Sequence, residues 1–182
     1  MSEPVVNEPA PASEFGPFGL RLLALSRWAA ILGGLCFMAL VVMSIVSIVG
    51  RKLFAIPVPG DVEMLQMTAA FASALFFAWC HMKRGDVKVD FFTAKLPPRI
   101  VHTLDALGSL LVAVVGLLLA WRTGVGAIGV MRSGETSMIL GVPQWISQML
   151  MVPGFALLGV VGLYMMAHCW RLRNAPTTEV KP

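Results

Sequence analysis

The chain has 182 residues, of which 57% are hydrophobic and only 13% are charged, and its mean hydropathy is +0.79. These values lie outside the range of soluble domains, and the apolar residues fall in long blocks, so we expect an all-α integral membrane protein. The net charge of +4 comes from Lys and Arg residues near the ends of those blocks. This pattern favours membrane topology signals over a nucleic-acid-binding surface.

The N-terminal segment and the first apolar block are distinct in composition. Residues 1–19 are rich in Pro, Glu and small residues and have no periodic apolar face, which predicts a disordered tail. The first uncharged block, Trp28–Gly50, follows Arg21 and Arg27 and is longer than the apolar core of a typical signal peptide. We therefore expect a retained transmembrane helix near residues 28–50.

A second membrane-spanning helix is predicted near residues 64–82. It follows the segment Ile56–Gly60, in which two prolines and a glycine predict a tight turn. Its uncharged run has acidic residues before it and Lys83 and Arg84 after it. At about 1.5 Å of rise per residue, the run is long enough to cross a hydrocarbon layer of about 30 Å.

Charged residues surround the turn between these two helices. Arg51 ends the first uncharged run, and Asp61 and Glu63 begin the second helix. A salt bridge between Arg51 and Glu63 across the turn at Gly60 is one interpretation. The alternatives are a charged surface for a partner protein and ordinary solvated loop charges.

The second helix also carries a stripe of small residues. Ala70, Ala74 and Ala78 recur every four residues and so lie on one helical face. Such a stripe permits close approach of another helix, either in this chain or in a partner, although an alanine-rich helix can produce it by chance.

A basic segment follows the second helix. Gly85 lies at its start, and Asp90 is placed to cap a short helix at Phe91–Leu96 before two prolines end it. The apolar residues of this short helix share a face, which is typical of a helix lying in the membrane interface. A plain amphipathic loop is the alternative.

The remaining sequence predicts two further spans, near residues 104–123 and 145–169. A helix over all of Pro98–Met131 would be about 50 Å long, so we expect either tilt or a break between Gly124 and Gly129.

The last span also has features of its own. Pro143 is expected to restart the helix, and Trp145 and Trp170 are expected to anchor it at the two interfaces. Pro153 should kink it. Residues 172–182 are polar and predict a second disordered tail, which leaves a transmembrane domain at residues 20–171.

The distribution of Lys and Arg predicts the orientation of the four spans. Ten basic residues lie on the side of both termini and of the 83–103 segment, and four lie on the other side. The positive-inside rule then places both termini in the cytoplasm. The four on the other side are Arg51, Lys52, Arg122 and Arg132.

Residues suited to catalysis are scarce, so we expect neither enzyme activity nor a cofactor. The sequence has no Gly-rich phosphate loop and no zinc-ligand motif, and its charged residues avoid the centres of all four spans. His81, His102 and His168 fall at one end of the spans, where they could in principle meet around a metal or haem. No two of them have the spacing of a shared helix face.

Several motifs in this order resemble the small membrane subunit, the DctQ-like small permease, of tripartite ATP-independent periplasmic (TRAP) transporters. They are Arg51, Gly60 and Glu63, then RGDVKVDFF with LPPRI, then SGETSMILGVPQW and VPG. The likeness extends over about residues 21–171. In the block after the second span Gly85 and Asp90 match the family pattern, but Asp86 replaces a histidine that is frequent there.

The resemblance implies a non-catalytic subunit of a bacterial inner-membrane importer, typically sodium-coupled and specific for organic acids. Its partners would be a large membrane subunit, which carries substrate and ions, a periplasmic substrate-binding protein, and membrane lipids. The small subunit would brace the scaffold of the large one. Two other classes stay open: a four-helix membrane redox subunit, and a membrane anchor for a soluble complex.

Overall fold

The protein consists of four long helices, seen in a computed structural model that describes residues 15–55, 58–85 and 98–174. The helices are α1 (Pro17–Phe54), α2 (Asp61–Met82), α4 (Pro98–Ser133) and α5 (Trp145–Asn174). All four are long and apolar enough to cross a membrane. The expected fold class, an all-α integral membrane protein with four spans, is confirmed.

Helix α1 is longer than its predicted span at both ends. It begins at Pro17, inside the range expected to be a tail, where a proline fits because the first helical N–H needs no partner. It ends at Phe54, and the capping residue Ala55 adopts a left-handed conformation with φ of 57°. Its 38 residues correspond to about 57 Å, so α1 must tilt in a bilayer or extend beyond the hydrocarbon layer.

The continuity of α4 and the starting residue of α5 test two predictions from the sequence. Helix α4 is continuous from Pro98 to Ser133 through Gly124 and Gly129, so its excess length is not absorbed by a break. Helix α5 begins at Trp145, and the expectation that Pro143 restarts it is wrong. Pro143 instead pairs with Thr136 in an isolated antiparallel bridge.

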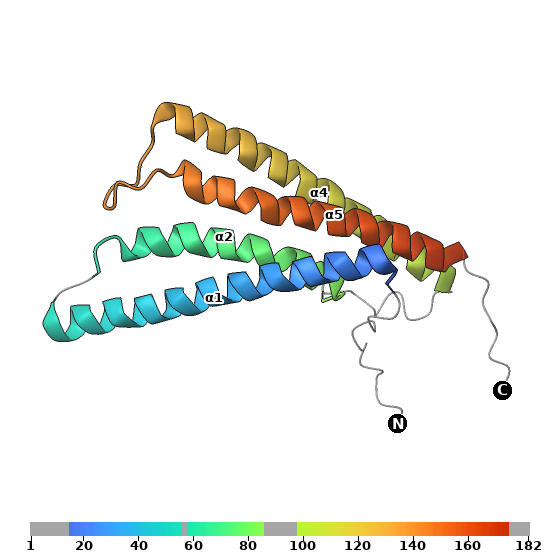
Figure 1. Ribbon diagram of the computed structural model, residues 1–182, viewed down its shortest axis with the longest axis horizontal. Helices are drawn as coiled ribbons and strands as arrows, with labels where there is room; N and C mark the ends of the chain where they lie inside the picture. The colour runs from blue at the N-terminus through green and yellow to red at the C-terminus, as the bar shows by residue number, and fades with distance from the viewer. Residues whose placement is uncertain (1–14, 56–57, 86–97, 175–182) are drawn as a thin grey trace, which may run out of the picture.

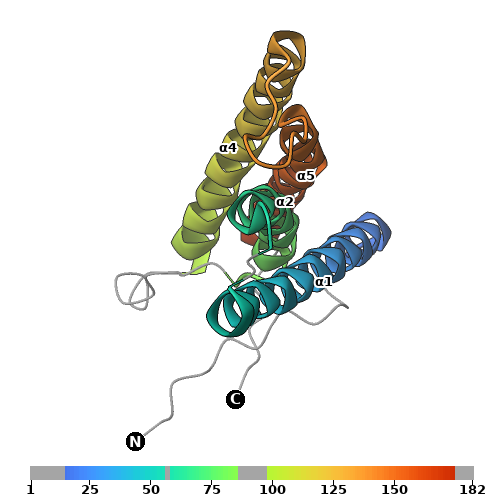
Figure 2. The ribbon, with the colours of Figure 1, turned by 90° about the vertical axis from the view of Figure 1, so that its left-hand side faces the viewer.

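The four helices form a layer one helix thick, in the order α1, α2, α5, α4. Packing is extensive between neighbours in this order, and α1 touches α5 only over a small area. Figure 1 shows the helices as a fan, and the end view in Figure 2 places α2 and α5 between α1 and α4. The layer therefore has two broad faces and two edge helices. A buried apolar cluster, which includes Leu22, Met82 and Val161, joins α1, α2 and α5 where these helices converge.

Small residues recur mostly at seven-residue spacing on the buried faces of the two edge helices, α1 and α4. Where α4 meets α5, a Cβ on Gly116 would lie 2.9 Å from the backbone nitrogen of Gly159, so the two backbones nearly touch. The spacing of seven corresponds to two helical turns and gives each edge helix a narrow seam. The buried residues at this spacing are Ala106, Ala113, Ala120 and Ala127 on α4, and on α1 Gly19, Ser26, Gly33 and Ser47 together with the larger Leu40. Gly19 lies against Tyr164 of α5.

The narrow seams leave most large apolar side chains on the outside. Leu35 and Met38 of α1 are 63% and 64% exposed, and Leu111 and Leu118 of α4 are similarly open. In water such surfaces would be unstable, so lipid or protein must cover both faces of the layer.

Some expectations lie outside the described residues. They are the short helix at Phe91–Leu96, its cap Asp90, and most of the two tails.

Candidate functional site

The N-terminus of α2 joins three parts of the molecule at one end, which we call the hairpin end. The hairpin end contains the α1–α2 turn and the 134–144 loop, whereas α1 begins and α5 ends at the opposite end, which we call the basic end (Figure 1). Two acidic residues in the first turn of α2 make the connections. Negative charge is favourable there because it complements the helix dipole.

Asp61 connects α2 to α1. Its carboxylate accepts a hydrogen bond from the Ser47 hydroxyl at 2.5 Å and forms a salt bridge with Arg51 at 3.0 Å. The expected Arg51–Glu63 salt bridge is therefore wrong. Residues 61 and 63 are about 200° apart around the helix, so only one of them can face α1.

Glu63 faces the opposite way and holds the 134–144 loop. Its carboxylate accepts a hydrogen bond from the Ser137 hydroxyl and others from the backbone N–H groups of Ile139 and Leu140, at 3.1 Å and 3.2 Å. A carboxylate with several donors converging on it is a strong local anchor. The loop that joins α4 to α5 is thereby fixed to α2.

Gly60 is required at the start of α2 for two reasons. Its φ of +71° is a left-handed conformation that side chains disfavour. A Cβ at this position would also lie 2.5 Å from Cγ of Leu140, which packs over the turn. A larger residue at position 60 would therefore strain the backbone and displace the Leu140 side chain.

The 134–144 loop is a short hairpin with an exposed apolar tip. Ser137 N–H donates to the Val142 carbonyl at 2.8 Å, and Gln144 N–H donates to the Glu135 carbonyl at 3.2 Å. Met138 at the tip is 98% exposed. The loop therefore holds an apolar side chain well away from the helices.

The alanine stripe of α2 packs inside the chain. Ala74 and Ala78 are fully buried, and Ala70 is half-buried. Gly154 of α5 approaches Ala74 so closely that a Cβ on the glycine would lie 2.9 Å from the Ala74 carbonyl carbon. Of the two partners considered for this stripe, the structure places the chain's own α5 against Ala74.

The remaining candidates lie at both ends. Gly85 follows α2 at the basic end, where its N–H donates to the Cys80 carbonyl at 2.9 Å. Trp145 is the first residue of α5 and is half-buried at the hairpin end. In the described parts of the chain, no group of three or more His, Cys, Asp or Glu residues is arranged to hold a metal ion.

Sequence reasoning identified Arg51, Gly60 and Glu63 but missed their partners. Ser47 had a usable signal, since it lies four residues before Arg51 and so shares its helical face. Ser137 had none, because its position depends on how a distant loop folds back. The site is therefore a set of hydrogen bonds and one salt bridge that connect α1, α2 and the 134–144 loop.

A comparison with protein families finds a match consistent with this arrangement. The family described as "Tripartite ATP-independent periplasmic transporters, DctQ component" matches residues 38–172, which is most of the chain and includes all of α2, α4 and the 134–144 loop. Searches of curated proteins and of solved structures find no significant match. The chain therefore belongs to the DctQ family, the small membrane component of TRAP transporters.

Proposed function

We propose that this chain is a non-catalytic subunit that braces the large transporting subunit of a TRAP importer in the bacterial inner membrane. The observation that carries the proposal is the single layer α1–α2–α5–α4. A layer one helix thick offers no enclosed path through its described residues, whereas secondary transporters bind substrate between helices near mid-membrane. A rigid, broad layer is suited to support a neighbour.

The charge distribution supports the same role. The two inner helices, α2 and α5, carry charged side chains only in their first and last turns. An organic-acid site at membrane depth would need a compensating cation or helix ends directed at the carboxylate. Substrate and coupling ion, which we propose to be an organic acid and sodium, are therefore assigned to the large subunit.

We further propose how the complex is arranged. Both termini face the cytoplasm, as the ten-to-four distribution of basic residues favours. The hairpin end then faces the periplasm, where the binding protein delivers substrate. The large subunit and lipids share the exposed apolar surfaces of the layer.

The candidate residues take structural roles in this proposal. Arg51, Gly60 and Glu63 stiffen the hairpin end, and the alanine stripe stiffens the centre. The candidates that complete the frame at its two ends are Gly85, Pro143 and Trp145. Asp90, which lies outside the described residues, remains a candidate for a structural role or a partner contact.

Copurification tests the bracing role. The chain, tagged at its C-terminus, is co-expressed with the large membrane subunit of the same transporter. An unrelated polytopic membrane protein at equal expression is the control for non-specific retention. We expect recovery of the large subunit near one copy per tagged chain. Recovery no greater than that of the control would contradict the proposal, and a haem absorption band in the purified chain would contradict its non-catalytic part.

A further inference from the structure

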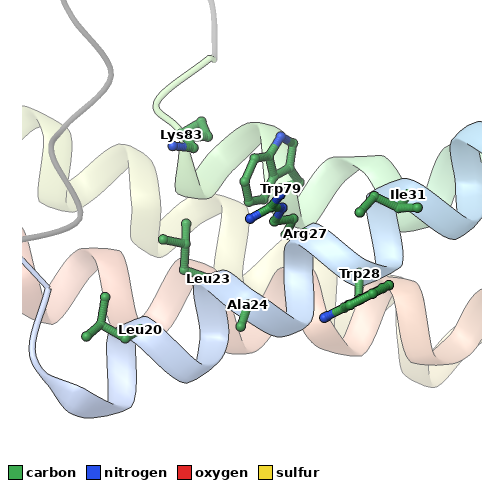
Figure 3. A pocket seen from close by; sticks show the side chains of 8 residues that line it. All are labelled: Leu20, Leu23, Ala24, Arg27, Trp28, Ile31, Trp79 and Lys83. Atoms are coloured by element: carbon green, nitrogen blue, oxygen red, sulfur yellow. The ribbon is translucent and has the colours of Figure 1, made fainter.

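A hollow of about 720 Å³ lies between α1 and α2 at the basic end. Figure 3 shows Arg27 extending from α1 toward the Trp79 ring of α2, with Lys83 at the end of α2 on the same side. Two cations and no carboxylate of the described residues line it. The lining residues are Leu20, Leu23, Ala24, Arg27, Trp28, Ile31, Trp79 and Lys83.

The α1 side of the hollow is one continuous helical face. Its six lining residues follow one another at spacings of three, one, three, one and three, which is the repeat of a single α-helical stripe. The stripe is apolar on both sides of Arg27, and Ile31, 42% exposed, lies one turn further toward the membrane. A ligand on this face would meet a cation flanked by apolar side chains.

The two cations lie at the same membrane boundary. Arg27 immediately precedes the uncharged run of α1, and Lys83 immediately follows that of α2, its antiparallel neighbour. Trp28 and Trp79 lie next to this boundary, and tryptophan is enriched at the headgroup level of bilayers. The hollow is therefore positioned at the depth of lipid headgroups.

From this arrangement we propose that the hollow binds the headgroup of an acidic glycerophospholipid, with its phosphate on Arg27. A guanidinium can donate two parallel hydrogen bonds to a phosphate. Lys83 adds a second positive charge, and its Nζ lies 5.2 Å from the centre of the Trp79 ring. This charge also offsets the partial negative charge at the C-terminal end of α2. An acyl chain would then run along Ile31 toward the hydrocarbon.

This site is independent of the bracing role. The α1 residues of the hollow precede Met38, where the family match begins, so membership of the family does not describe them. A bound lipid would fill the gap between α1 and α2 at the basic end, where α1 extends beyond its predicted span. It would add a further contact that holds α1, an edge helix, against α2.

The test uses the purified full chain and native mass spectrometry. Phosphatidylglycerol and phosphatidylcholine with identical acyl chains are compared for the wild type, for Arg27→Gln with Lys83→Gln, and for Lys52→Gln with Arg132→Gln. The last variant removes the same charge from two exposed cations at the hairpin end. Elution as a single species and an unchanged melting temperature verify that each variant is folded.

We expect the wild type to prefer phosphatidylglycerol and the first variant to lose this preference. Removing two cations at a membrane surface should lower the affinity for phosphatidylglycerol by roughly tenfold or more. The hairpin-end variant should remain within about twofold of the wild type. Arg27→Gln alone should account for most of the loss of affinity for phosphatidylglycerol. Because Arg27 is exposed, this substitution should leave the fold intact.

Three results would overturn the proposal. The first is wild-type binding by Arg27→Gln or by the double variant. The second is an equal loss in the hairpin-end variant, because that would indicate diffuse attraction. The third is displacement of phosphatidylglycerol by millimolar inorganic phosphate, because free phosphate would then be the ligand.

Discussion

The close contact between Gly154 of α5 and Ala74 of α2 predicts the effect of Gly154→Ala on stability. The new Cβ would lie 2.9 Å from both the carbonyl carbon and the oxygen of Ala74, and 3.0 Å from its Cβ. Ordinary contacts begin at 3.4 Å, so the α2 backbone would have to move away by about 0.5 Å. Because the obstacle is backbone, no side-chain rotation relieves it.

The size of the effect follows from two opposing terms. Overpacking of a tight contact costs about 1–3 kcal/mol. Replacing glycine by alanine in a helix gains about 1 kcal/mol. We therefore expect Gly154→Ala to lower the free energy of unfolding by about 0–2 kcal/mol.

Gly129→Ala is the matched control. Gly129 also lies inside a helix, α4, but no atom lies within 4 Å of where its Cβ would be. The substitution should therefore stabilise the chain by about 0.5–1 kcal/mol through helix propensity alone. The difference between the two variants, about 1–3 kcal/mol, measures the α2–α5 contact.

Equilibrium unfolding in mixed micelles, followed by tryptophan fluorescence, gives both free energies. Adding Ala74→Gly to Gly154→Ala should restore only part of the loss, because two of the three close atoms belong to the Ala74 backbone. If Gly154→Ala proved as stable as Gly129→Ala, α2 and α5 would not approach as described.

Three further predictions concern the hairpin end. Arg51→Glu should lower the melting temperature, and adding Asp61→Arg to it should restore part of the lost melting temperature. A double variant no more stable than the less stable single variant would show that the two residues are not coupled. Glu63→Ala should speed hydrogen exchange of the Ile139 and Leu140 amides, which donate to the Glu63 carboxylate. Unchanged exchange would count against these hydrogen bonds. In a cysteine-free background in whole cells, an impermeant thiol reagent should label Met138→Cys but not Ser2→Cys, and the reverse pattern would refute the orientation.

The four spans could be predicted because charges are costly in hydrocarbon. Uncharged runs such as Trp28–Gly50 therefore identify membrane segments directly. The true helix ends could not be obtained in this way. Arg27 marks where the uncharged run begins, but a helix can continue past the end of such a run, and α1 does so as far as Pro17.

The lateral arrangement depends on contacts that a single sequence does not specify. The stripe of Ala70, Ala74 and Ala78 indicated close packing without indicating the partner helix, which is α5 at Ala74. The choice between Asp61 and Glu63 as partner of Arg51 depended on the rotation of α2, and the two differ by about 200° around the helix.

We propose that this chain is required for transport but binds no substrate itself. The most direct measurement is uptake of labelled organic acid, driven by a sodium gradient, into vesicles containing the large subunit and supplied with the binding protein, with and without this chain. We expect that uptake requires the chain, that the preference among substrates follows the other two components, and that the chain alone binds no labelled substrate. Full uptake without the chain, or substrate binding by the chain alone, would contradict it.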